Sequence, residues 1–483
     1  MKNIFLFTLL AFILLGCSDE FLENKPQGQL TAANFFTEPD HAVWATNATY
    51  EQMRSFDVHV FSYLGLTDII SDDADKGSTP SDGNFLLELD NFTFDPGNIA
   101  FDVVWQGYYR GINRANVALE NIPNIEMDEA LQERLLAENK FLRGYFYFNL
   151  VRWFGPLPLV TRPLERSEYD QERQPVEAIY AQIIQDFEEA ALVLPVQYPA
   201  AQRGRATKGA ANGMLAKVYL TRQNYAEAAR VAEEVINSGR YALLPSYSQI
   251  FSEAGENSSE SLFEVQSAAF ETSGGATQFN EVQGVRGTPN LGWGFNRPSD
   301  NLVASYEPGD PRREATILYP GEVLPDGSAI VEDNPNIFNE RYNQKAFVVS
   351  HAGGNGNGPG NIRILRYADI LLIAAEALNE LGRPEEALTY LNLIRKRARG
   401  QSQSILRDIT VTDQAQLRSI IWRERRSEFA MEQQRWFDIT RQMRAGEVMR
   451  AAGKPFVDGK HELLPIPQSE IDISGSLNQN PMY

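Results

Sequence analysis

Apolar residues recur at steps of three and four along residues 366–400, and this spacing predicts two consecutive amphipathic helices. The apolar stripe of the first helix comprises Tyr367, Leu371, Ala374, Leu378 and Leu381. Gly382 can adopt the positive φ that ends a helix, and Pro384 suits the first position of the next helix. Acidic residues at the start of the second helix and basic residues at its end match the helix dipole. The segment therefore predicts an antiparallel helical hairpin.

The same template fits residues 211–239. Tyr219 matches Leu378 in this comparison, and Ala228 matches Ala387. Units of about 34 residues with alanines where the helices meet are typical of tetratricopeptide repeats, which stack to bury a shared core. We therefore predict an all-α fold of tetratricopeptide-like hairpins. Because the interval between the two units is long, unrelated amphipathic hairpins in an all-α protein are the alternative.

The chain changes character between these units. Residues 241–362 are rich in Gly, Asn, Pro and Ser, which predicts an irregular insertion carried by the helical scaffold. A second polar stretch, residues 71–98, is predicted to be a long loop of the functional or mobile kind. In order, we predict a leader, a helical N-terminal region, the insertion and a helical C-terminal region: 1–16, 17–240, 241–362 and 363–483.

The N-terminus has the pattern of a secretion signal. Lys2 precedes an apolar run over residues 4–15, which is too short to span a membrane. The run ends in Leu-Leu-Gly and then Cys17, which resembles a bacterial lipobox, where a lipid is attached to the cysteine thiol. Cys17 is the single cysteine of the chain, so no internal disulfide can form. We predict a lipid anchor at Cys17 without a spanning helix, and an ordinary signal peptide is the alternative.

Charge and motif content argue against several classes of protein. The formal net charge of −20 argues against a nucleic-acid partner, since phosphate binding needs a basic surface. The sequence has neither a Gly-x-Ser-x-Gly motif nor a P-loop. The histidines lack metal-ligand spacing; they are His41, His59, His351 and His461. We therefore predict no catalytic residues, no metal site and no cofactor.

Two groups of acidic residues allow a second interpretation. Glu424 and Glu428 are expected on the inward face of a helix, where paired acids can serve a glycosidase, but nearby arginines favour structural ion pairs. Asp72, Asp73 and Asp75 could ligate calcium through their oxygens. Their spacing lacks the glycine and glutamate of a calcium loop, so solvated loop acids are the favoured interpretation.

Two loops combine aromatic and polar side chains, which suits a sugar ligand. Aromatic rings cover the flat C–H faces of sugars, and polar groups bond their hydroxyls. The predicted ligand contacts are Trp293, Phe295, Asn296 and Arg297 in one loop, and Asp72, Asp73, Lys76 and Asn84 in the other. The alternative for Trp293 is packing of the insertion against the scaffold. The remaining tryptophans lie in helical patterns and are expected in the core: Trp44, Trp105, Trp153, Trp422 and Trp436.

Five segments in order resemble the SusD/RagB family of surface lipoproteins. They are Cys17 followed by Phe21, Leu22, Lys25 and Pro26, then residues 137–161, 366–382 and 422–441, and a tail at 463–467 and 479–483. Met482 stands where the family usually has glycine, so the terminal turn is expected to differ slightly.

The resemblance implies an all-α body of tetratricopeptide-like hairpins with an irregular ligand-binding face. It implies a SusC-like TonB-dependent outer-membrane transporter as partner, over which the lipoprotein closes as a lid. The implied function is capture of extracellular glycans, or of peptides in some members, for import without catalysis. The implied location is the outer membrane, lipid-anchored and exposed at the cell surface. An envelope scaffold without a small ligand and a secreted hydrolase are the alternatives.

Overall fold

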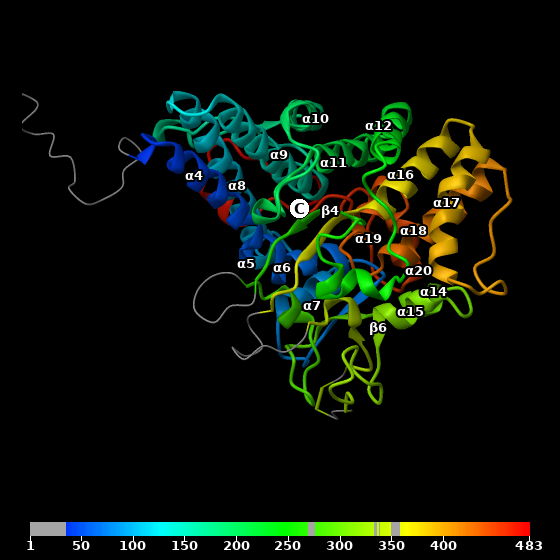
Figure 1. Ribbon diagram of the computed structural model, residues 1–483. Coiled ribbons are helices and arrows are strands. Elements are labelled where there is room, and N and C mark those ends of the chain that lie inside the picture. The colour runs from blue at the N-terminus through cyan, green and yellow to red at the C-terminus, as the bar shows by residue number, and fades with distance from the viewer. Residues whose placement is uncertain (1–34, 269–275, 333–335, 338, 349–357) are drawn as a thin grey trace, which may run out of the picture.

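The computed structural model describes residues 35–268, 276–332, 336–337, 339–348 and 358–483. A curved row of helices crosses the molecule, and each helix packs against the next (Figure 1). The row consists of α4 (Pro39–Arg54), α8 (Ile99–Asn121), α9 (Glu129–Phe154), α10 (Val176–Val193), α11 (Lys208–Thr221), α12 (Tyr225–Asn237), α16 (Tyr367–Glu380), α17 (Pro384–Arg399) and α18 (Gln414–Phe429). The predicted all-α fold class is confirmed.

The two predicted hairpins are α11–α12 and α16–α17, and they are neighbours in space. Helix α12 packs directly against α16, although residues 238–366 separate them in sequence. The alanines of the template are fully buried where the helices meet, as Ala228 and Ala387 show. Burying small residues lets helix backbones approach closely, so the repeat continues across the insertion.

Short elements connect the row and build the insertion, which lies below the helices in Figure 1. The short helices are α5 (Phe56–His59), α6 (Phe61–Leu64), α7 (Asn84–Asp90), α13 (Phe279–Gln283), α14 (Asp300–Ser305), α15 (Pro311–Thr316), α19 (Arg435–Arg441), α20 (Ala445–Ala451) and α21 (Gln468–Ile473). The prediction of one long loop at residues 71–98 is wrong, because this stretch contains a strand and helix α7.

The described residues also contain four pairs of short antiparallel strands. The strands are β1 (Ala74–Gly77), β2 (Leu157–Pro158), β3 (Arg173–Gln174), β4 (Ser261–Val265), β5 (Phe295–Pro298), β6 (Ile317–Leu318), β7 (Tyr342–Asn343) and β8 (Ile362–Arg366). Strand β4 near the start of the insertion pairs with β8 at its end. This pairing returns the chain to the helical row close to the point where it left.

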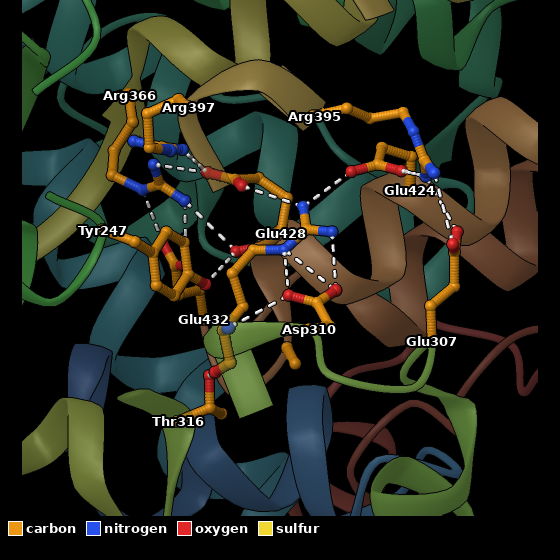
Figure 2. A network of polar contacts seen from close by, with 12 residues as sticks. Tyr247, Glu307, Asp310, Thr316, Arg366, Arg395, Arg397, Glu424, Glu428 and Glu432 are labelled. Atoms are coloured by element: carbon orange, nitrogen blue, oxygen red, sulfur yellow. Dashed lines mark hydrogen bonds and ion pairs between the residues drawn. The ribbon is translucent and has the colours of Figure 1, made fainter. Parts of the chain in front are cut away.

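A largely buried network of ion pairs joins the insertion to the scaffold, and Figure 2 shows it from close by. We call it the charged seam; it comprises Glu260, Glu307, Asp310, Arg312, Lys345, Arg366, Arg395, Arg397, Glu424, Glu428 and Glu432. Arg312 of the insertion reaches Glu424 of α18 at 2.7 Å. Arg366 at the end of β8 reaches Glu260 at 2.6 Å and Glu432 at 2.7 Å.

The charged seam shows which role Glu424 and Glu428 have, that of paired glycosidase acids or that of structural ion-pair partners. Burial alone would raise the pKa of Glu428, but Arg397, Arg366 and Arg312 outweigh burial and hold this pKa at about 2. Glu424 bonds Arg395 at 2.7 Å in the same network. The interpretation of Glu424 and Glu428 as structural ion-pair partners is confirmed.

The C-terminal tail returns to the N-terminal helices. The Asn480 side chain donates to the Phe154 carbonyl at 2.9 Å, and the Gln468 backbone N–H donates to the Pro96 carbonyl at 2.9 Å. Met482 has a φ of 67°, in the left-handed region that favours glycine. The turn therefore keeps a conformation suited to glycine even though methionine occupies it.

Candidate ligand-binding surface

The fold brings the two predicted ligand loops together. Strand β1 of the first loop pairs with β5 of the second, which sets Gly77 opposite Phe295 and Asp75 opposite Arg297. The Asp75 carboxylate and the Arg297 guanidinium form an ion pair of 2.6 Å across the strands. Two stretches more than two hundred residues apart therefore form one surface.

Five aromatic rings gather beside this strand pair, and we call them the aromatic surface: Phe56, Phe61, Phe85, Trp293 and Phe295. Phe61 is central, with ring centroids 4.7 Å from Phe295, 5.2 Å from Phe85 and 5.8 Å from Trp293. Phe295 is buried, the rings of Phe61, Phe85 and Trp293 are half-buried, and Phe56 is 42% exposed. Phe295 thus forms the buried base of the cluster, and the other four rings are partly exposed to solvent.

Glycines allow the close packing under these rings. At Gly83, which has a φ of 58°, an added Cβ would lie 2.9 Å from the Phe295 ring. At Gly292, just before Trp293, an added Cβ would lie 2.1 Å from the Glu281 carbonyl oxygen. The Trp293 backbone N–H donates to that same carbonyl at 2.8 Å. The Gly-rich loop is therefore held tightly, and it presents the indole from a fixed backbone.

Polar groups form a rim around the aromatic surface. Asn84 is exposed at the start of α7. Arg286 pairs with Asp82 and donates to the Ser78 hydroxyl at 2.6 Å, and its hydrogen bond lowers the pKa of the Asp82 carboxyl. Both members of this pair keep about a third of their side chains exposed (33% and 37%), so the rim can exchange partners with a ligand.

The Lys76 ammonium group stabilises the turn at residues 79–82, behind this rim. It donates to the backbone carbonyls of Thr79 and Asp82, each at 2.7 Å, and lies 5.5 Å from the Phe295 ring centroid. Burial lowers its pKa. Lys76 thereby fixes the loop that carries Asn84 and Asp82.

Three predicted ligand contacts lie beneath the surface. Asp72 and Asp73 are 3% and 1% exposed; Asp72 pairs with Arg435 at 2.7 Å, and Asp73 pairs with Arg426 at 2.7 Å. Asn296 is fully buried, with a φ of 57°, and its amide donates to Asp68 at 3.0 Å and to Gln283 at 2.8 Å. These groups hold the strands under the rings.

The buried acids also bear on the calcium interpretation. The Asp72 carboxylate is bonded by two guanidinium groups, those of Arg435 and Arg426, and these arginines lower its pKa against the effect of burial. Within the described ranges, no group of three or more His, Cys, Asp or Glu is arranged to hold a metal ion. The interpretation of Asp72 and Asp73 as solvated loop acids is wrong, because both are buried ion-pair partners.

Of the other predicted contacts, Asn84 is exposed, Trp293 and Arg297 are partly exposed with Arg297 paired to Asp75, and Lys76 and Phe295 are buried. The sequence reasoning missed Phe56, Phe61 and Phe85. Their signal is weak, because an aromatic residue in an apolar run has the same pattern whether it packs inward or lies at the edge of a surface.

The other tryptophans divide into two groups. Trp105, Trp153 and Trp436 are buried, as predicted. The core prediction is wrong for Trp44, which is 52% exposed on α4, and only partly right for Trp422, which is half-buried and donates to Glu376 at 3.0 Å.

Cys17 and the leader lie outside the described residues. Among the residues that the structure describes, no helix combines the length and apolar character needed to cross a bilayer.

A row of paired helices interrupted by one loop-rich insertion defines a class of α-helical repeat proteins. Sequence models of two families match this chain: one described as the SusD family at residues 259–483, and one described as starch-binding, associating with the outer membrane, at residues 41–220. SusD-like protein P2 of Formosa agariphila is 33% identical, with 99% of each chain covered. A SusD-like protein of Bacteroides ovatus is 27% identical over 89% of this chain and 80% of its own.

Solved structures agree with these matches. A laminarin-binding SusD-like protein superposes with a TM-score of 0.80 at 32% identity, over 92% of this chain and 100% of its own. Surface glycan-binding protein A of Bacteroides thetaiotaomicron, solved with laminarihexaose, gives a TM-score of 0.79 at 25% identity, over 92% and 100%. The chain belongs to the SusD family, and the predicted family membership is confirmed.

Proposed function

We propose that this protein binds extracellular glycan at the aromatic surface and its polar rim. The observation that carries the proposal is the β1–β5 pairing, which joins two distant segments into one surface on which Trp293 packs against Phe61. Half-buried rings offer flat apolar area to the C–H faces of a sugar. Asn84, Asp82 and Arg286 offer donors and acceptors for the hydroxyls.

The ligand class is supported by relatives of the same fold. One structural neighbour above is named as laminarin-binding, the other is a surface glycan-binding protein solved in complex with laminarihexaose, and one matching family is described as starch-binding. These are neutral glucose polymers, and an open surface suits a long chain whose ends extend beyond the site. Laminarihexaose and maltoheptaose are therefore the first probes.

The test is calorimetric titration of the purified protein with both oligosaccharides. We expect saturable binding of at least one, and at least about tenfold weaker binding, ~1.4 kcal/mol, in Trp293→Ala. Trp44→Ala is the matched control, since it removes an exposed indole of α4 whose ring contacts are Phe35 and His41 and not the five rings of the aromatic surface. Equal affinity in wild type and Trp293→Ala would overturn the placement of the site.

The remaining parts of the proposal concern delivery. The leader at residues 1–16 directs export, a lipid on Cys17 tethers the mature chain to the outer membrane, and the insertion at 241–362 presents the ligand to a SusC-like TonB-dependent transporter. Cys17→Ser should release the protein from the membrane fraction while oligosaccharide affinity is kept. Co-purification of the wild-type chain with a porin-like transporter tests the partner, and retention without any glycan affinity would favour a scaffold role instead.

A further inference from the structure

A second concave region lies along helix α8, away from the β1–β5 strand pair. Segments 158–171 and 470–477 form its opposite walls, and its volume is about 860 Å³. We call it the α8 groove. This volume is in the range of clefts that hold small organic ligands.

The walls of the α8 groove are fixed by specific hydrogen bonds. The Tyr109 hydroxyl donates to the Pro158 carbonyl at 2.8 Å and ties α8 to the first wall. Asp170 accepts from the Ser474 hydroxyl at 2.6 Å and from the Ser476 backbone N–H at 3.1 Å, which joins the two walls. The groove is therefore formed before any ligand arrives, which lowers the entropic cost of binding.

The lining combines rings with neutral polar groups. Trp105 and Tyr109 lie at the base, and Tyr169 stands 68% exposed at the edge. Gln106, Asn113 and Gln171 supply amides that both donate and accept hydrogen bonds. The amphipathic groups match the alternating C–H faces and hydroxyls of a sugar.

The charges that line the groove balance. Arg110 and Arg166 carry positive charge, and Asp170 and Glu470 carry negative charge. Arg110 is already paired with Asp57, and burial in the groove raises the pKa of Glu470. A site for an anionic ligand would need an excess of positive charge, so the lining favours a neutral molecule.

One contact relates the groove to the aromatic surface. Arg110 lines the groove, and its ion-pair partner Asp57 directly follows Phe56, an exposed member of the aromatic surface. The two regions therefore approach each other through α5 and α8, which also pack together.

We propose that the α8 groove is a second binding site for a neutral oligosaccharide, with Tyr169 as its main stacking ring. The proposal rests on the glycan-binding function above for its ligand class, but on a separate set of residues. Two sites on one chain raise the apparent affinity for a polymer through effective concentration, without any new contact.

The experiment uses saturation-transfer NMR and calorimetry with laminarihexaose and maltoheptaose, and affinity electrophoresis with laminarin and starch. In the Trp293→Ala background we expect residual oligosaccharide binding, which adding Tyr169→Ala abolishes. Tyr169→Phe should keep it, because the ring remains. On the polymers, Tyr169→Ala alone should weaken retention at least about fivefold.

The outcomes separate the two proposals. If Trp293→Ala alone removes all binding and Tyr169→Ala changes nothing, the groove is not a site and the aromatic surface stands. If Tyr169→Ala removes binding and Trp293→Ala does not, the groove stands and the aromatic surface falls. If neither oligosaccharide binds the wild type, both proposals are wrong for neutral glucans. Tyr169 is largely exposed, so unchanged thermal unfolding verifies that the variant folds.

Discussion

The charged seam and the rim of the aromatic surface contain the same chemical pair, a carboxylate and a guanidinium, in opposite surroundings. Arg366 and Glu428 of the seam are 3% and 0% exposed, whereas Arg286 and Asp82 of the rim keep about a third of their side chains in water (33% and 37%). A buried charge depends on its partners, while an exposed one can release a partner at little cost. The comparison teaches that solvent exposure, rather than residue type, separates the structural charges of the seam from the rim charges that we propose to contact a ligand.

The largest effect should come from breaking the seam. Glu428→Gln leaves Arg312, Arg366 and Arg397 without their shared buried carboxylate, and we expect a loss of about 3–5 kcal/mol in the free energy of unfolding. Chemical denaturation of wild type and variant measures it. A loss under about 1 kcal/mol would mean that the seam is not the fastening that its geometry indicates.

The next effect concerns Asp68, which lies under the aromatic surface and accepts from Asn296 and Gln433. Burial raises its pKa from 3.8 to about 6. The folded state therefore binds this proton more tightly, and the stabilisation is complete below about pH 4 and is lost as pH rises through about 6.

Relative to Asp68→Asn, the free energy of unfolding of the wild type should thus fall by up to about 3 kcal/mol between pH 4 and pH 7. Denaturant midpoints across this range give the difference, in which other titrating groups cancel. A flat difference would show that Asp68 titrates near its ordinary pKa.

A smaller effect on stability, with a clear effect on ligand binding, is expected at Trp293. Its ring is half-buried, so Trp293→Ala should cost about 1–2 kcal/mol of stability, while binding falls at least about tenfold. Parallel thermal unfolding and titration separate the two quantities. Loss of binding only in proportion to loss of fold would make Trp293 a packing residue, the alternative raised by its sequence.

The smallest effect should follow Asp82→Asn at the rim. This is the exposed counterpart of the seam substitution, and we expect a stability change of about 0–1 kcal/mol that shrinks further at high salt. Affinity for oligosaccharide should change more than stability, since we propose that Asp82 and Arg286 contact the ligand. A stability loss comparable with that of Glu428→Gln would erase the distinction between seam and rim.

Much of the fold could be predicted from helical periodicity. The stripes that define α11–α12 and α16–α17 depend on residues three and four apart, which one sequence shows directly. The adjacency of α12 and α16 could not be predicted that way, because it depends on the pairing of β4 with β8 across the insertion. Trp44 shows where prediction from helical periodicity fails. Its position in a helical pattern does not specify whether that face of the helix packs against the core, and the side chain is exposed.

The candidate site was predictable only in part. Trp293 was identified because a Gly-rich loop offers little cover for an indole. Asp72 was misplaced because the side chain that buries it, Arg435, lies 363 residues away in sequence. The spacing of neighbouring residues carries no information about such a distant partner, so Asp72 and Asp73 were predicted to be solvated.

The pairing of β4 with β8 has an evolutionary consequence. The two ends of the insertion lie side by side where β4 pairs with β8. The insertion can therefore be replaced as a unit while the stacked hairpins stay unchanged. Such an exchange must keep Arg312 and Lys345, since their counterions lie in the C-terminal region: Glu424 on α18 and Glu432 in the turn that follows it. A different ligand specificity could thus arise by replacing the whole insertion, provided that Arg312 and Lys345 are kept.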